Sequence, residues 1–355
     1  QNIKEFNILK TNLSYVSPSK FKELSRHSFK RGDIVLTKLG DPLGAAAIVD
    51  DLEEGLIVAD LVRIRINQEI IDTKFLCYLL NSPSIKVQIN SQSKGATRPR
   101  IKLSVIRDLR ITYPPLSEQQ RIVAKLDDAF SEIDKILEMK RKQLSENKKL
   151  FKSLLDGCYH NIFESMKIGD LGQVSSGGTP SSNNQDYWEG NIQWYSSGEL
   201  NNKFTEKSIK RITNEGLRNS NAKVFPKGSL LVGMYDTAAM KMSILTEEST
   251  FNQAIVGIAP NKFVSSEYLF FTLNYLRESI LKHRRGVRQQ NLSLAKIKNI
   301  EIPVPEIKKQ NSLVAKLNFI TQQTTIYQEY LSSIIDNLLA LKLAFLSNEI
   351  KVEFK

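Results

Sequence analysis

The sequence predicts an α+β protein that is built twice: two globular domains, each followed by a long helix, with the two helices packed as an antiparallel coiled coil. Three observations predict this fold. A rare segment recurs at a constant distance, two long stretches carry a coiled-coil apolar period, and short strand-like runs precede each stretch. At 355 residues the chain also exceeds the size at which one apolar core stops growing, so we expect two domains.

The recurring segment starts at a proline and runs into Val-Ala-Lys-Leu. Pro114 and Gln119 match Pro305 and Gln310 at a shift of 191 residues (305 − 114 = 310 − 119), and Val-Ala-Lys-Leu follows four residues after each glutamine. A unit has therefore been used twice. The predicted boundaries are a first globular domain at 1–113, a helix at 114–163, a second domain at 164–303 and a second helix at 304–355.

Both long stretches place apolar residues in alternating steps of three and four, which is the 3.5-residue period of a supercoiled seam. Each helix would span about 40 residues, or roughly 60 Å. Neither can bury its stripe alone, so we expect the helices to pack on each other as a stiff spacer; that each lies on its own domain stays open. The predicted seam is Val123, Leu126, Phe130, Ile133, Leu137, Leu144, Phe151 and Leu154 in the first helix, and Leu317, Ile320, Tyr327, Leu331, Ile334, Leu338 and Leu341 in the second.

The globular segments have mixed character. The runs "GDIVLTKL", "GLIVADLVRIRI", "GSLLVGMY" and "NQAIVGIAP" are rich in Val and Ile and are bounded by residues that favour turns, so they predict strands. The runs "DTKFLCYLLNSPSIKVQINSQS" and "SSEYLFFTLNYLRESILKHR" have helical apolar spacing after a polar start.

The chain carries 50 Lys and Arg against 38 Asp and Glu, a formal charge of +12. Residues 1–163 hold 27 basic and 20 acidic side chains, and residues 164–355 hold 23 and 18. An excess spread over both halves suits two surfaces that each face a polyanion. The alternative is that the charge serves solubility only.

Several chemistries are excluded by what the sequence lacks. Cys77 and Cys158 are far apart, and His27, His160 and His283 lack metal-ligand spacing, so we expect neither a disulfide framework nor a metal site. No apolar run approaches a membrane span and no secretory signal is recognised, which predicts a cytoplasmic protein without a membrane partner.

Catalytic motifs are also missing. "SSGGTPS" lacks the Lys-Ser/Thr ending of a phosphate-binding loop, and "TYPPL" lacks the Asn or Asp of an adenine methyltransferase motif. HExxH and GxSxG do not occur. We therefore predict a non-catalytic protein with no cofactor of its own.

Two homologous loops, just before the strand and proline that lead into each long helix, are the best candidates for DNA contact. Cations neutralise phosphates, Arg can pair with guanine, and Gln or Asn with adenine. A solvated charged loop is the alternative. The candidates are Lys94, Arg98, Arg100 and Lys102 in "SKGATRPRIK", and Lys282, Arg284, Arg285, Arg288, Gln289, Gln290 and Asn291 in "KHRRGVRQQN".

A second candidate surface combines aromatic and hydroxyl side chains that often contact base edges: Thr179, Trp194, Tyr195, Ser196 and Ser197. Its tryptophan, like the nearby Trp188, could equally anchor a core. The core interpretation is favoured for Trp188.

Taken together, the sequence resembles the specificity subunit of type I restriction-modification systems. The likeness covers nearly the whole chain and is carried by the Pro-Pro-Leu-Ser-Glu-Gln-Gln helix start at 114–120, by the twofold repeat, and by "SSGGTPSSNNQDYWEGNIQWYSSGEL" at 175–200. The last stretch resembles the opening of the family's target recognition domains.

The resemblance implies a subunit that takes part in defence against phage without chemistry of its own. Two target recognition domains would each read one half of a split, asymmetric sequence in double-stranded DNA. The paired helices would dock two adenine methyltransferase subunits, where S-adenosylmethionine is expected, and two motor and nuclease subunits would join this core. A coiled-coil protein scaffold and a stand-alone DNA-binding regulator are the alternatives from other classes.

One departure from the family pattern affects the first domain. About 60 residues separate Met166 from Phe225 in the second copy, whereas 28 precede the equivalent Phe29 in the first. The first recognition domain is therefore short of the opening segment within this sequence. Either the domain is abbreviated or further residues precede position 1, and both alternatives stay open.

Overall fold

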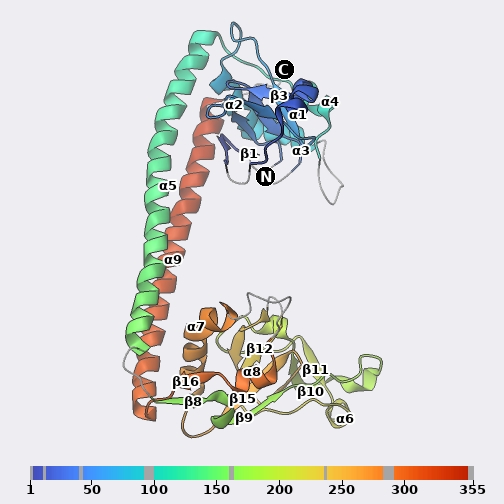
Figure 1. Ribbon diagram of the computed structural model, residues 1–355, viewed down its shortest axis with the longest axis vertical. Helices are drawn as coiled ribbons and strands as arrows, with labels where there is room; N and C mark the ends of the chain where they lie inside the picture. The colour runs from blue at the N-terminus through green and yellow to red at the C-terminus, as the bar shows by residue number, and fades with distance from the viewer. Residues whose placement is uncertain are drawn as a thin grey trace. The chain divides into compact units, whose positions relative to one another are not determined.

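A computed structural model describes residues 3–10, 13–39, 43–91, 100–159, 164–235, 238–282 and 292–350 (Figure 1). The chain forms two compact units: unit 1 comprises residues 1–144 and 329–355, and unit 2 comprises residues 145–328. The division cuts both long helices, α5 (Leu116–Tyr159) and α9 (Ile307–Glu349). Each unit thus includes part of both helices, whereas the sequence boundaries treated each helix as a segment of its own.

Unit 1 is built around a three-stranded antiparallel sheet in the order β5, β4, β7. All four residues of β4 are buried, as expected for a central Ile-Val-Leu-Thr strand. The bounds are β1 (Ile3–Lys4), β2 (Asn7–Ile8), α1 (Pro18–Glu23), β3 (Ser28–Lys30), β4 (Ile34–Thr37), β5 (Ala46–Ile48), β6 (Glu54–Leu56), β7 (Leu61–Ile64), α2 (Thr73–Asn81), α3 (Pro83–Ser91) and α4 (Leu103–Arg107), with a 3-10 turn at Ser25–His27.

Unit 2 contains a four-stranded sheet in the order β13, β12, β15, β9 and a three-stranded sheet in the order β11, β10, β14, and β16 pairs with β8. The bounds are β8 (Ser165–Lys167), β9 (Gly172–Ser176), β10 (Trp188–Tyr195), β11 (Lys210–Ile212), α6 (Asn214–Arg218), β12 (Leu230–Gly233), β13 (Met242–Ile244), β14 (Thr250–Phe251), β15 (Ile255–Pro260), α7 (Ser266–Lys282), α8 (Leu294–Lys298) and β16 (Glu301–Pro303), with 3-10 turns η2 (Ile168–Asp170), η3 (Gln185–Tyr187) and η4 (Ser197–Glu199).

The repeated glutamine has a structural role in unit 1. Gln119 is fully buried, and its Oε1 accepts a 2.8 Å hydrogen bond from the backbone N–H of Asp72, the N-cap of α2. Its Nε2 donates to the carbonyl oxygens of Ile70 at 3.1 Å and Pro114 at 2.8 Å. One side chain therefore satisfies three backbone groups and ties the start of α5 to the start of α2.

Gln310 makes the same contacts in unit 2. Its Oε1 accepts from the backbone N–H of Ser265 at 2.9 Å, and its Nε2 donates to the carbonyl oxygens of Phe263 and Pro305, both at 2.7 Å. The rare Pro-x4-Gln pattern is thus a clamp between a long helix and the helix that covers the sheet.

The long helices run antiparallel in each unit. In unit 1 the first part of α5 lies beside the last part of α9: Leu126 and Leu346 belong to one apolar cluster, Lys125 Nζ lies 2.7 Å from Glu349 Oε1, and Lys342 Nζ lies 2.7 Å from Asp134. In unit 2 the last part of α5 lies beside the first part of α9, because Leu155 and Leu317 pack in one cluster and Gln328 Nε2 donates to Asn147 Oδ1 at 3.2 Å.

Most of the predicted seam is turned inward. The buried or partly buried members are Val123, Leu126, Phe130, Ile133, Leu137, Leu144 and Phe151 in α5, and Leu317, Ile320, Leu331, Ile334 and Leu338 in α9. Three predicted members require correction, because Leu154, Tyr327 and Leu341 are 42%, 40% and 45% exposed.

The inward side chains at those turns are the next residues along each helix. Leu155 packs in place of Leu154, Gln328 bonds to Asn147, and Lys342 bonds to Asp134 with its Nζ 4.6 Å from the centre of the Phe130 ring. At these three turns the predicted seam advances by three residues, whereas the face that packs against the partner helix advances by four. Leu155 is favoured by an apolar cluster, whereas Gln328 and Lys342 have a polar and an ionic partner on α5.

Helix α9 is more apolar than the sequence analysis expected. Among the described helices it alone passes a length-and-composition test for a membrane span, with an 18-residue window of mean hydropathy 1.3 that is 11% buried. Phe319 and Ile326 are 64% and 53% exposed on it. A single helix of this kind is weak evidence for a span, but it shows that α9 carries apolar side chains beyond those that face α5.

Candidate nucleic-acid interface

The two basic loops lie mostly outside the described residues. This applies to Lys94, Arg98, Arg284, Arg285, Arg288, Gln289, Gln290 and Asn291, and to the side chain of Lys282, which is the last residue of α7. The structure does describe how each loop rejoins its unit, through Arg100 and Lys102 in unit 1 and Leu292 in unit 2.

In unit 1 the loop rejoins at the end of β4. The backbone N–H of Ile101 donates to the Lys38 carbonyl at 2.8 Å, and the N–H of Lys38 donates to the Asp60 carbonyl at 2.7 Å. Arg100 forms a bridge with Leu39 and places its Nη2 2.8 Å from Asp60 Oδ1. Lys102 is exposed one residue ahead of α4.

The same arrangement recurs at the end of β12 in unit 2. The N–H of Leu292 donates to the Met234 carbonyl at 3.1 Å, and the N–H of Met234 donates to the Ala254 carbonyl at 2.9 Å. In both units, a described residue just after the basic loop bonds to the residue that follows the central strand, and that residue bonds to the one before β7 or β15.

The cation at this point in unit 1 is available to another anion. Arg100 and Asp60 are 55% and 44% exposed, and ion pairs this accessible contribute about 0–1 kcal/mol to stability. Exchanging the carboxylate for a phosphate would therefore cost little. Lys38 lies beside it, a residue that the sequence analysis missed because it follows a strand rather than standing in a basic run.

The second candidate surface is exposed at Thr179 and buried at Trp194 and Tyr195. Thr179 Oγ1 donates a short hydrogen bond to Gln253 Oε1, and both side chains are exposed next to Ala254. The Gly-Gly-Thr-Pro segment and the loop before β15 thus meet at the end of β12. Gln253 was also missed by the sequence analysis, since a single amide carries no motif.

The two aromatic residues of that surface face inward, so the prediction that they contact base edges is wrong. Trp194 and Tyr195 are 7% and 2% exposed; Trp194 Nε1 donates to the Gly178 carbonyl at 2.9 Å and Tyr195 Oη to the Glu206 carbonyl at 2.6 Å. Trp188 is only half-buried and packs edge-on against Trp194 at 5.1 Å. Sequence cannot tell which aromatic residue of a strand faces the core, because the 188–192 region contains a register shift.

The two serines differ in their contacts. Ser196 caps η4, where its Oγ and backbone N–H both bond to Glu199 Oε2 at 2.7 Å, so its hydroxyl is engaged in the fold. Ser197 is the partly buried first residue of that turn. A contact between Ser197 and a base stays a prediction.

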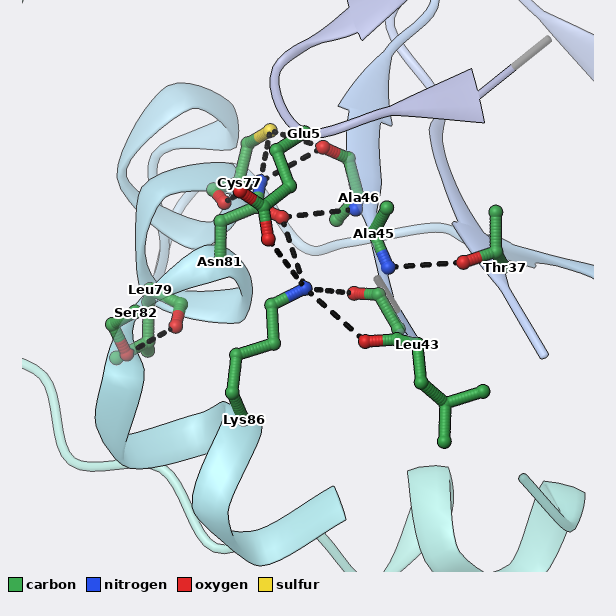
Figure 2. Close-up of polar contacts among 11 residues, drawn as sticks. Glu5, Thr37, Leu43, Ala45, Ala46, Cys77, Leu79, Asn81, Ser82 and Lys86 are labelled. Carbon is green, nitrogen blue, oxygen red and sulfur yellow. Dashed lines mark hydrogen bonds and ion pairs between the residues drawn. The ribbon is translucent and has the colours of Figure 1, made fainter. Parts of the chain in front are cut away.

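A partly buried lysine, Lys86 of α3, holds the residues that lead into β5 in unit 1 (Figure 2). Lys86 Nζ donates to the Gly44 carbonyl at 2.7 Å and lies 3.2 Å from Glu5 Oε1. Burial lowers the pKa of Lys86, which the Glu5 carboxylate partly offsets. Asn81 completes the anchor by exchanging hydrogen bonds with the backbone of Ala46 at 3.0 and 2.8 Å. The Gly44 carbonyl and the backbone of Ala46 are therefore held against α3 and α2.

No metal-binding arrangement occurs in the part of the chain that the structure describes: no three His, Cys, Asp or Glu side chains group together there. Cys77 is buried, and desolvation raises its pKa to about 12. A thiol held neutral in this way is a poor nucleophile.

Comparison with known proteins identifies the family. The family described as "Type I restriction modification DNA specificity domain" matches residues 6–146 and 162–334. The chain belongs to this family. The specificity domain is matched twice along the chain, in agreement with the internal repeat.

Two relatives and one solved structure illustrate the likeness. The EcoR124I/EcoR124II type I restriction enzyme specificity subunit of Escherichia coli is 26% identical over 208 residues, which are 57% of this chain and 50% of that protein. The HindI specificity subunit of Haemophilus influenzae is 21% identical over an alignment of 417 positions, gaps included, that covers 93% of this chain and 88% of that protein. The match to the E. coli relative thus spans about half of its length.

The structure is a chain from a study of complex assembly and conformational transition in the type I restriction-modification system. It superposes with a TM-score of 0.76 at 19% identity and covers 91% of this chain and 83% of that chain. At this identity the likeness establishes the fold.

Proposed function

We propose that this specificity-domain chain is the DNA-recognition subunit of a type I restriction-modification complex and acts in the cytoplasm. Unit 1 and unit 2 each read one half of a bipartite, asymmetric target in double-stranded DNA. The observation that carries the proposal is the recurrence of one anchoring scheme, in which a basic loop returns to the end of the central strand in both units. Loops of different sequence on two units of the same fold can recognise two half-sites of different sequence.

The long helices support a second part of the proposal, the docking of two adenine-N6 methyltransferase subunits. Exposed apolar side chains such as Phe319, Ile326, Met139 and Leu150 are more than half exposed and exceed what α5 and α9 need for each other. S-adenosylmethionine would be held by those partners, and two motor and nuclease subunits would join through them.

DNA binding is tested with a matched set of variants. Replacing Arg100 and Lys102 with Ala, or Arg284 and Arg285 with Ala, should weaken binding to duplex DNA and reduce the slope of log K against log salt by about one per lost phosphate contact. Arg121→Ala removes an exposed arginine of α5 that pairs with Glu118, and it should leave the slope unchanged. Equal slopes for all three proteins would remove both loops from the interface.

The bipartite target is tested in the host. Deleting the gene should erase one N6-methyladenine motif made of two fixed halves and a fixed gap. Methylation that persists after deletion would contradict the proposal, and a lost motif with one half only would contradict the two-reader arrangement.

A further inference from the structure

Gln253 and Thr179 form a side-chain pair on the surface of unit 2, at the end of β12. The Thr179 hydroxyl donates to Gln253 Oε1, and both side chains are exposed. A hydrogen bond between exposed side chains adds little to stability, because water can replace either partner. The pair therefore needs an explanation other than the stability of the fold.

Gln253 is the second residue of a tight turn whose backbone is bonded on both sides. The N–H of Asn252 donates to the last carbonyl of β10 at 2.9 Å, and the N–H of Ile255 donates to the Asn252 carbonyl at 3.2 Å. The Ala254 carbonyl accepts from the N–H of Met234, also at 2.9 Å. A side chain on a backbone fixed in this way costs less entropy to order when it binds a partner.

Two glycines bring Thr179 to this turn. The N–H of Gly178 donates to the Phe251 carbonyl at 2.9 Å. A Cβ added to Gly177 or Gly178 would collide with backbone atoms of the neighbouring segments. The Gly-Gly-Thr-Pro segment therefore lies so close to its neighbours that only glycine fits, and this close approach places the Thr179 hydroxyl against Gln253.

The equivalent point of unit 1 has a different chemistry. Residues 64 and 258 are equivalent in the registers of β7 and β15, a shift of 194 (258 − 64 = 253 − 59), so Ala59 takes the position of Gln253. The side chain that reaches this point is Arg100, whose Nη2 lies 3.5 Å from the Ala59 carbonyl oxygen and 2.8 Å from Asp60 Oδ1. At the same point of the fold, unit 1 thus presents a guanidinium and unit 2 an amide.

A glutamine amide matches the major-groove edge of adenine. Its oxygen accepts from the adenine N6 amino group, and its nitrogen donates to N7. The amide oxygen has two lone pairs, so Gln253 Oε1 can accept from Thr179 and from a base together. Phosphate contacts would come from the basic loop, which rejoins unit 2 where Leu292 bonds to Met234.

We propose that Gln253 is a specificity-determining residue of unit 2 that recognises one adenine of its half-site, and that Thr179 is the positioning residue that holds its amide. The adenine is one that is not itself methylated, because a base that is modified must leave the stack. Unit 1 carries Arg100 at this point, so the two half-sites differ in the base that is read here. The proposal rests on the DNA-reading role proposed above.

The test maps N6-methyladenine in a host that lacks the gene and is given back the chain or a variant of it. The unchanged chain should restore a bipartite motif; if it does not, the DNA-reading role itself fails. Gln253→Ala should raise methylation about tenfold at sites in which one A·T pair of one half is replaced, and it should leave the other half unchanged. Gln173→Ala, at an exposed glutamine of β9, is the matched control and should leave the motif as it is.

Further substitutions separate reading from folding. Gln253→Glu should change the preferred base at the same pair from adenine to cytosine, because a carboxylate accepts from the cytosine amino group. A misfolded chain cannot gain such a preference. Thr179→Val, which removes the hydroxyl at nearly constant volume, should relax the same pair as Gln253→Ala, and Thr179→Ser should keep the motif.

Several outcomes overturn the proposal. Gln253→Ala could keep the motif of the unchanged chain, relax a pair other than A·T, or relax both halves to the same extent. Loss of all methylation in both Gln253 variants would also overturn it, because the residue would then serve the fold rather than one base pair. If Thr179→Ser relaxes the motif as Thr179→Val does, Thr179 does not position the amide through its hydroxyl.

Discussion

In each unit a side-chain contact connects the helix that covers the sheet, α2 or α7, to a long helix. The two contacts use equivalent positions, but the covering helix supplies a cation in unit 1 and a carboxylate in unit 2. In unit 1, Lys74 on α2 bonds Asp127 on α5, with Nζ to Oδ2 at 2.6 Å. In unit 2 the equivalent positions (74 + 193 and 127 + 191) hold Glu267 and Asn318, which bond at 3.3 Å, and Lys203 adds the cation. The buried glutamine clamp, by contrast, is the same in both units.

The difference follows from what each contact satisfies. Gln119 and Gln310 are the partners of buried backbone groups, and their planar amides offer an acceptor and a donor at the end of a side chain one methylene longer than that of Asn. The ion pairs are partly exposed, so water can replace a lost partner and the residues are free to change. After the duplication, the residues that hydrogen-bond buried backbone groups have therefore stayed the same in both units. The partly exposed ion pairs have changed.

The largest expected effect comes from substitutions in the seam between α5 and α9. These substitutions test whether unit 1 and unit 2 unfold independently. Leu126 and Leu317 are both fully buried, so Leu126→Ala and Leu317→Ala should each lower the free energy of unfolding by about 3 kcal/mol. Both tryptophans lie in unit 2, so their fluorescence reports that unit. Leu317→Ala should shift the tryptophan-detected urea midpoint, and Leu126→Ala should shift only the circular dichroism transition.

A control for the seam is Leu154→Ala, which removes an exposed leucine and should change the free energy of unfolding by less than about 0.5 kcal/mol. If Leu126→Ala moves the tryptophan midpoint as far as Leu317→Ala, the two units unfold as one and the comparison between them loses its basis.

The next effect tests the clamp in each unit. Gln310→Ala leaves one backbone N–H and two carbonyls without their partner, so we expect a loss of about 2 kcal/mol in the tryptophan-detected transition. Gln119→Ala should cause a similar loss in unit 1, seen by hydrogen exchange at residues 70–76. A loss in one unit only would mean that the repeated glutamine has diverged in function.

The smallest effect concerns the exchanged ion pair. The hydrogen bond from Lys203 lowers the pKa of Glu267 from its usual 4.5. The stability that this shift provides is present above pH 4.5 and is lost as the pH falls through the lowered pKa. The free energy of unfolding of unit 2, followed by tryptophan fluorescence, should fall between about pH 7 and about pH 3. In Glu267→Gln this fall should be smaller by up to about 1 kcal/mol.

Glu248→Gln, at an exposed position of the same unit, is the matched control for this acid effect. If Glu267→Gln and Glu248→Gln reduced the acid-induced loss of stability equally, the removal of any negative charge would explain the effect. The bond between Lys203 and Glu267 would then have no specific role in it.

Much of the fold could be predicted from the sequence because its signals are local. The shift of 191 residues between Gln119 and Gln310 revealed the duplication, and the apolar period revealed α5 and α9. The candidate site was predictable only in part. Arg100 was found through charge, whereas Lys38 and Gln253 were missed because they matter through neighbours distant in the chain.

Sequence by itself determined the twofold plan, the two long helices and the basic character of both halves, since repetition, periodicity and composition are properties of residues along one chain. Tertiary structure alone decided that Trp194 faces the core and that Lys342 rather than Leu341 lies on the seam. The physical reason is that burial and pairing depend on partners brought together by folding, and a residue type does not name its partner.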